Sequence, residues 1–266
     1  MLTADSADRV GTFKVAFMTG ASLFVMGYLN GLAQNTYDLG IMITPQTGNV
    51  IWMGLNAGWG YWGLFIENLS LFFGFMIGAA FALFTQNSFK NKSFQFYYNW
   101  SVFALPIMLY PFIMQYVVPP FLSYLLLGFA SGAALGFFRK MYHMEINNAM
   151  ATGNVRFLGL HFAGAFIKRN KKEIGTFWIF FACVFLFAGG AFLYALFARM
   201  DYNLGLEGGG MLIGLGDAAS RIHRQALGLG VHDFQATSNI IRVIGLMVIC
   251  IIPYFFCPKY TPAKPE

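Results

Sequence analysis

The polar residues with the clearest spacing for chemistry form a repeated tripeptide, Thr47-Gly48-Asn49 and Thr152-Gly153-Asn154. Each copy opens a similar apolar phrase, TGNVIWMGL in the first case and TGNVRFLGL in the second. Threonine and asparagine cap helix starts well, and the free N–H groups of a first turn favour an anion or a polar group. The pattern therefore predicts two short helices, capped at Thr47, Asn49, Thr152 and Asn154, whose N-termini bind a small polar or anionic solute.

Arg156 adds a positive charge two residues after Asn154. A charge near the middle of a membrane is costly, and its default interpretation is functional. We therefore predict that Arg156 contacts the solute. The structural alternatives are an ion pair with Glu145, Glu67 or Asp38, or a side chain that reaches into a cytoplasmic vestibule.

A second shared landmark precedes each tripeptide. The segments GYLNG (27–31) and GFASG (128–132) each hold two glycines four residues apart, a spacing typical of closely packed membrane helices. Asn30 and Ser131 stand at equivalent positions between the glycines, and both are polar. We predict that they line the same cavity as the tripeptides.

Glu67 and Glu173 follow the two tripeptides at nearly equal distances, 18 residues after Asn49 and 19 after Asn154. Glu67 has no basic residue close to it in the sequence, so it is the candidate for proton coupling. Glu173 lies in the basic run KRNKKE and is interpreted as a surface charge. His161 is interpreted as a packed or vestibule histidine.

The sequence contains no arrangement typical of catalysis or metal binding. The three cysteines lie in or beside apolar runs, and there is no C-x-x-C pair, no Cys/His cluster and no Ser/His/Asp spacing. We therefore predict no enzyme activity, no metal, no cofactor and no nucleic-acid partner.

These polar residues are embedded in a chain that is 58% hydrophobic and only 11% charged, against about 25% charged residues in soluble domains. About 20 apolar residues cross the hydrocarbon core of a membrane as a helix. Six runs are long enough for this: 14–34, 63–85, 94–115, 119–138, 174–198 and 237–257. The sequence therefore predicts an all-α membrane protein with six transmembrane helices.

The tripeptide segments, about 49–60 and 154–167, are too short for an ordinary span and carry polar interruptions. If both return to the side they entered and the N-terminus is cytoplasmic, 13 lysines and arginines fall inside and 4 outside. If both cross fully, the loops at 90–92 and 139–140 move outside, the division becomes 8 against 8, and Arg156 lies within the membrane. Cytoplasmic loops are enriched in Lys and Arg, so two re-entrant half-helices are predicted.

Two re-entrant segments make the chain an inverted internal repeat, an arrangement that recurs in transporters. We predict a cytoplasmic tail at 1–13, a first membrane repeat at 14–115, a second at 116–257 and a cytoplasmic tail at 258–266. Residues 200–236, which are rich in glycine, are interpreted as an extracytoplasmic loop or an engineered insertion within the second repeat.

The phrase GYLNGLAQNTYDLGIMITPQTGNVIWMGL and the later ATGNVRFLGL resemble the YoaK-like family of bacterial integral membrane proteins. That family shows a G-[YF]-x-[DN] start followed by T-G-N-x-x-x-x-G, repeated weakly in its second half. The resemblance covers about residues 14–198 and the final span. Asn30 stands where an acidic residue is common, and 200–236 is unusual. No activity is established for the family, so the resemblance implies a fold and a membrane location.

Three functions are compatible with the sequence. The first is a channel or secondary transporter for a small polar or anionic solute, located in the bacterial inner membrane as a multi-pass protein with both termini cytoplasmic. The second is a non-transporting assembly or regulatory subunit. The third is an intramembrane enzyme acting on lipid, for which the sequence offers few converging groups. The expected partners are the lipid bilayer and the solute, and the sequence leaves a homo-oligomer open.

Overall fold

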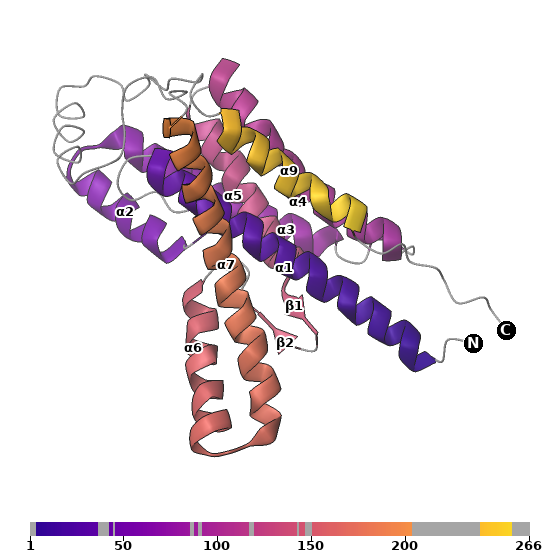
Figure 1. Cartoon of the computed structure of the whole chain (residues 1–266). Helices are drawn as coiled ribbons and strands as arrows, with labels where there is room; N and C mark the ends of the chain where they lie inside the picture. Colours follow the sequence, from indigo (N-terminus) through magenta and orange to yellow (C-terminus); the bar gives the residue numbers. More distant parts are fainter. Residues whose placement is uncertain are drawn as a thin grey trace.

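The structure is a computed structural model that describes residues 4–36, 43–44, 46–85, 88–89, 92–116, 120–142, 144–146, 151–203 and 240–256. Its helices are α1 (Ala4–Thr36), α2 (Gln46–Gly58), α3 (Trp62–Thr85), α4 (Lys92–Tyr116), α5 (Pro120–Phe137), α6 (Ala151–Phe162), the π-helical turn η1 (Ala163–Ile167), α7 (Lys171–Asn203) and α9 (Ile240–Phe256). A short antiparallel hairpin of β1 (Lys140–Met141) and β2 (Met144–Glu145) joins α5 to the segment before α6 (Figure 1).

The prediction of an apolar, mostly helical protein is confirmed for the part of the chain that the structure describes. Each of the six predicted spans coincides with a helix, namely α1, α3, α4, α5, α7 and α9. Within the described ranges, three stretches are long and apolar enough to cross a membrane: Val15–Leu32, Trp62–Thr85 and Lys171–Phe197. Phe121–Phe137 and Ile244–Phe255 are apolar but shorter. These apolar helices indicate a membrane protein.

Two boundaries differ from the predicted ones. Helix α1 begins at Ala4, so most of the predicted 1–13 tail belongs to the first helix. Helix α7 continues to Asn203 and includes the first residues of the predicted loop at 200–236, the rest of which lies outside the described residues. The predicted tail at 258–266 also lies outside them.

Helices α3 and α5 are packed so closely that their backbones touch. A methyl group added at Gly74 would collide with the carbonyl of Leu125. One added at Gly128 would collide with the carbonyl of Leu71. The contact is reciprocal, because each carbonyl lies three residues before the glycine of its own helix. Small residues at such crossings allow backbones to approach in membrane helices.

Helices α1 and α7 make the same reciprocal contact. A methyl group at Gly27 would collide with the carbonyl of Phe187, and one at Gly190 with the carbonyl of Phe24. Again each carbonyl precedes its helix's own glycine by three residues. The first helix of each predicted repeat therefore packs on the helix that follows the tripeptide in the other repeat.

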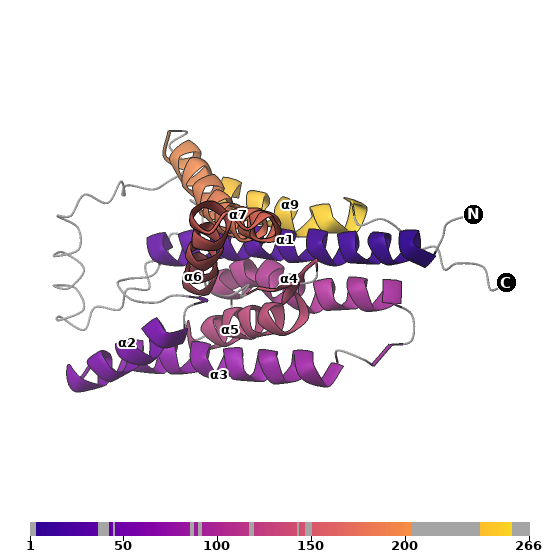
Figure 2. The same cartoon turned by 90° about the horizontal axis from the view of Figure 1, so that it is seen from below.

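The two pairs run in opposite directions (Figure 2). Within each pair the helices are roughly parallel, since successive contacts advance along both chains. Figure 2 shows that α1 ends on the side where α3 begins, and that α2 leads back to this side rather than across the molecule. The start of α1 and the end of α9 lie together on the opposite side (Figures 1 and 2).

The largest core cluster joins the two pairs to α4 and α9. Tyr28, Leu71, Trp100 and Phe103 are all fully buried in it. The indole N–H of Trp100 donates a hydrogen bond to the carbonyl of Cys250 at 2.8 Å, which links α4 to α9. Many large apolar side chains on the outside of the helices are exposed, as expected where lipid is the solvent.

Candidate functional site

The helices that carry the tripeptides begin before them. Helix α2 starts at Gln46 and α6 at Ala151, so each asparagine lies within the first turn instead of at a cap. The predicted capping positions are therefore wrong. Figure 1 shows the first turn of α6 toward the middle of the molecule and its C-terminal end at the periphery, and Figure 2 shows the same arrangement for α2.

Asn49 is fully buried and belongs to a short chain of polar contacts. Its side-chain Nδ2 donates to Oε1 of Gln46 at 3.4 Å, and Nε2 of Gln46 donates to the carbonyl of Ile43 at 3.3 Å. The hydroxyl of Thr44 accepts a hydrogen bond from Nδ2 of Asn30 at 3.0 Å. The structure thus brings Asn30 and Asn49, two predicted site residues, to the same buried segment.

Thr44 and Gln46 were not predicted as site residues, although both are buried. The signal was present in the sequence, because the segment ITPQ places two polar side chains directly before the first tripeptide. Thr47, which was predicted, has an exposed side chain.

The second half supplies two buried polar groups at the corresponding positions. Asn154, in the first turn of α6, is 1% exposed. Ser131 on α5 is fully buried, and its hydroxyl has no hydrogen-bond partner in the described part of the chain. Buried polar atoms are nearly always paired with protein or with water, so the Ser131 hydroxyl stands out among the buried groups of α5. The side chain of Thr152 lies outside the described residues.

Arg156 is not brought together with Asn154. Two residues along an α-helix correspond to a rotation of about 200°, so a buried Asn154 places Arg156 on the opposite side of α6. The Arg156 side chain is exposed, as this geometry requires. Helix α6 therefore presents its amide to the interior and its guanidinium to the outside.

Glu67 lies near the start of α3 with a half-buried side chain. Its neighbour Asn68 is fully buried; Nδ2 of Asn68 donates to the carbonyl of Leu64 at 2.9 Å, whereas Oδ1 has no hydrogen-bond partner among the described residues. The start of α3 therefore combines the carboxyl group of Glu67 with the buried amide oxygen of Asn68, which can accept a hydrogen bond.

Glu173 is not an isolated surface charge, as the sequence had suggested. Its Oε2 lies 2.5 Å from Nδ1 of His161 and joins the start of α7 to the end of α6. The His161 ring stacks on Phe180 with an interplanar angle of 8° and a centroid separation of 5.4 Å. A methyl group at Gly164, in the π-helical turn, would lie 2.9 Å from the Glu173 side chain. The pair closes the α6/α7 hairpin.

The class and the family follow from these observations. Long apolar helices around buried polar first turns define a helical membrane protein. Residues 18–215 match the family described as "Protein of unknown function (DUF1275)", and the chain belongs to that family. The resemblance to YoaK-like proteins is consistent with this match. No curated protein and no solved structure matches the chain.

Proposed function

We propose that this protein is a channel or secondary transporter that passes a small polar or anionic solute between the first turns of α2 and α6. The observation that carries the proposal is the burial of Asn49 and Asn154, 0% and 1% exposed, at equivalent places in two short helices. Both amides have interaction partners within the protein, and polar side chains held in place at the inner ends of two short helices are suited to orienting a polar solute.

The arrangement of the helices supports an inverted repeat with six transmembrane helices and two re-entrant half-helices. Exchanging α1 with α5 and α3 with α7 converts one reciprocal glycine contact into the other. The two pairs run in opposite directions (Figure 2), which is the relation expected of inverted repeats. In this proposal the protein spans the bacterial inner membrane several times, and both termini are cytoplasmic, in keeping with its distribution of Lys and Arg.

The groups that would recognise the solute are amides, hydroxyls and helix N-termini. Asn30, Asn49, Ser131 and Asn154 supply the side chains, and the first turns of α2 and α6 supply partial positive charge. Arg156 faces away from Asn154 and is assigned to the cytoplasmic vestibule, where it would attract anions before they enter. Glu67 remains the candidate for proton coupling, since it is adjacent to Asn68, whose buried Oδ1 has no hydrogen-bond partner among the described residues.

Flux into proteoliposomes tests this proposal. Urea, glycerol, formate and phosphate serve as probes, and stopped-flow light scattering measures their entry relative to empty liposomes. We expect at least one probe to enter faster with the protein. The Asn154→Leu substitution should slow that probe about 10-fold, because a hydrogen bond to the solute is lost. Asn170→Leu, at an exposed residue near the hairpin tip, is the matched control.

A non-transporting subunit is the second candidate. The observation that favours it is the large apolar core, in which Trp100, Tyr28 and Phe103 are fully buried. If no probe enters faster than into empty liposomes, or if Asn154→Leu and Asn170→Leu behave alike, the transport proposal is wrong and the subunit candidate takes its place.

A further inference from the structure

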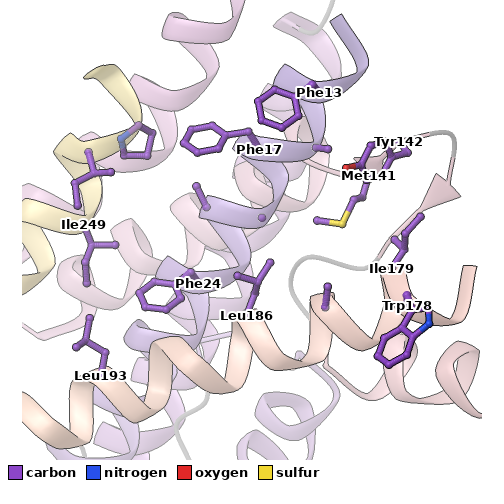
Figure 3. A pocket seen from close by; sticks show the side chains of 16 residues that line it. Phe13, Phe17, Phe24, Met141, Tyr142, Trp178, Ile179, Leu186, Leu193 and Ile249 are labelled. Atoms are coloured by element: carbon purple, nitrogen blue, oxygen red, sulfur yellow. The ribbon is translucent and has the colours of Figure 1, made fainter. Parts of the chain in front are cut away.

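A groove of about 740 Å³ opens between α1, α7 and α9 and is closed at one end by the β1/β2 hairpin. Figure 3 shows Phe17 and Phe24 from α1, Leu186 and Leu193 from α7, and Ile249 from α9 along its walls. Among the side chains that line it, only those of Tyr142 and Trp178 carry a polar atom. The groove is therefore apolar along its walls, apart from the two amphipathic residues Tyr142 and Trp178.

Those two residues lie at the same end of the groove (Figure 3). Tyr142 is 45% exposed and Trp178 is 55% exposed. Tyrosine and tryptophan are enriched where a membrane meets water, because one side of the ring is apolar and the other forms hydrogen bonds. The opposite end, at Leu193 and Ile249, carries apolar side chains. The groove therefore has the polarity gradient of one membrane leaflet.

Two basic residues stand at the polar end. Arg139 and Lys140 directly precede the groove residues Met141 and Tyr142, and both are exposed. Glu145 lies opposite Lys140 across the hairpin. Arg139 instead lies opposite Ile146, whose backbone N–H donates to the Arg139 carbonyl, so no acidic residue faces Arg139 in the described part of the hairpin. The polar end of the groove is thus suited to an anion at the membrane surface.

The hairpin that carries these charges is fixed to both walls of the groove. The buried hydroxyl of Thr19 on α1 donates a hydrogen bond to the carbonyl of Lys140 at 2.6 Å. Sγ of Cys183 on α7 lies 3.5 Å from Sδ of Met141. Tyr142 has φ of 55°, a left-handed conformation that is uncommon for a residue with a side chain. The basic end is therefore held in place by its surroundings.

From these observations we propose that the groove binds an anionic phospholipid of the bilayer, with an acyl chain along the groove and the headgroup at Arg139 and Lys140. The groove is long enough for an acyl chain. Trp178 and Leu193 both lie on α7 and are separated by about 22 Å of helix, which exceeds the depth of one hydrocarbon leaflet, roughly 15 Å. The proposal is independent of transport, because it concerns the outer surface of the α1/α7 pair and not the buried first turns.

Native mass spectrometry of the detergent-solubilised protein tests the acyl-chain part. Titration with phosphatidylglycerol and phosphatidylcholine gives a Kd for each. Ala182 lines the groove and is exposed, so Ala182→Phe should fill it and weaken binding of both lipids at least about 10-fold. Ala188→Phe changes an exposed alanine of the same helix outside the groove and should leave both Kd values unchanged. Equal Kd values for the two variants would overturn the proposal.

The headgroup part is tested by charge removal. Replacing Arg139 and Lys140 together by Gln should weaken phosphatidylglycerol binding roughly 5- to 30-fold, at about 1 kcal/mol per basic residue near a membrane surface, and leave phosphatidylcholine unchanged. The control replaces Lys168 and Arg169, which are exposed at the tip of the α6/α7 hairpin, with Gln. An unchanged preference for phosphatidylglycerol would contradict the proposal. So would a change of oligomeric state in Ala182→Phe without a change in lipid binding, which would assign the groove to a second copy of the chain.

Discussion

The α3/α5 and α1/α7 pairs share one crossing point but differ on the C-terminal side of it. In α3/α5 the close contact continues for another turn, where a methyl group at Gly78 would collide with the carbonyl of Phe129 and one at Gly132 with that of Phe75. In α1/α7 the residue four after Gly190 is Tyr194, and Gly31 faces its ring instead of a backbone. Tyr194 is buried edge-on against Tyr28 at 5.4 Å. The two pairs therefore share only the reciprocal contact between a glycine and a backbone carbonyl at the crossing point.

The pairs also differ before the crossing. Helix α3 starts at Trp62 and crosses its partner at Gly74, whereas α7 starts at Lys171 and crosses at Gly190. The stretch of α7 before the crossing is therefore longer by about two turns. The additional turns of α7 are covered by α6 and the π-helical turn, which together form the projecting hairpin in Figure 1. A tight, reciprocal crossing thus occurs in both pairs, whereas their peripheral parts differ.

The largest expected effect separates backbone contact from ring contact. Gly78→Ala places a methyl group against the backbone of α5, which cannot yield without moving the helix, and overpacking costs about 1–3 kcal/mol or more. Gly31→Ala places its methyl group 2.9 Å from Cδ1 of the Tyr194 ring, which can rotate, so its cost should be smaller. Thermal unfolding in detergent measures both. Equal decreases in Tm for Gly78→Ala and Gly31→Ala would mean that the two helix pairs are packed equally closely after the crossing.

An intermediate effect is expected at the α6/α7 hairpin. His161→Ala removes the contact with Glu173 and the stacking on Phe180. A hydrogen bond to a charged group contributes about 1.5–3 kcal/mol. Because these side chains are partly exposed, we expect the substitution to lower the free energy of unfolding by about 1–2 kcal/mol. Hydrogen exchange should accelerate in α6 and leave α2 unaffected. His161→Gln retains a hydrogen-bonding side chain and serves as the control. Uniform acceleration in α2 and α6 would show that the hairpin is not an independent unit.

The last comparison is between the two equivalent polar positions, and the smallest expected change is at Ser131. Asn30→Ala removes hydrogen bonds to the carbonyl of Met26 and to Thr44, so it should destabilise the protein by about 1–2 kcal/mol. Ser131→Ala removes a buried hydroxyl that has no partner among the described residues, so stability should stay the same or rise by up to about 1 kcal/mol. Chemical denaturation measures the two variants. A clear loss of stability in Ser131→Ala would reveal a partner for the hydroxyl and weaken its assignment to the solute site.

Local patterns in the sequence predicted the helices and the packing glycines well. The runs of apolar residues marked all six long helices, and GYLNG and GFASG marked the crossing faces, because both signals depend on neighbouring residues alone. The repeated tripeptide marked the starts of two short helices, but it predicted caps at Asn49 and Asn154, whereas the structure buries both side chains in the first turns. The side of α6 on which Arg156 lies could have been predicted from helical rotation once Asn154 was assigned to the interior.

The equivalence of Glu67 and Glu173 could not be predicted by counting from the tripeptides. The structure aligns Gly74 with Gly190, and the residue seven before each is Glu67 in one helix and Cys183 in the other. The count failed because the second half has additional turns between its tripeptide and its packing glycine, and these turns pair Glu173 with His161 instead. Distances along the chain do not reveal where extra residues have been accommodated.

The two glycine crossings join helices that are very different distances apart in the sequence, and this difference sets the order in which the crossings can form during synthesis. Gly74 and Gly128 are separated by 54 positions in the sequence (128 − 74), whereas Gly27 and Gly190 are separated by 163 (190 − 27). At about 5–20 residues per second, the α3/α5 crossing becomes available roughly 3–11 s after α3 is made, but α1 waits roughly 8–33 s for α7. The glycine face of α1 therefore lacks its α7 partner until well after the α3/α5 crossing has become available, and the α3/α5 pair can form first.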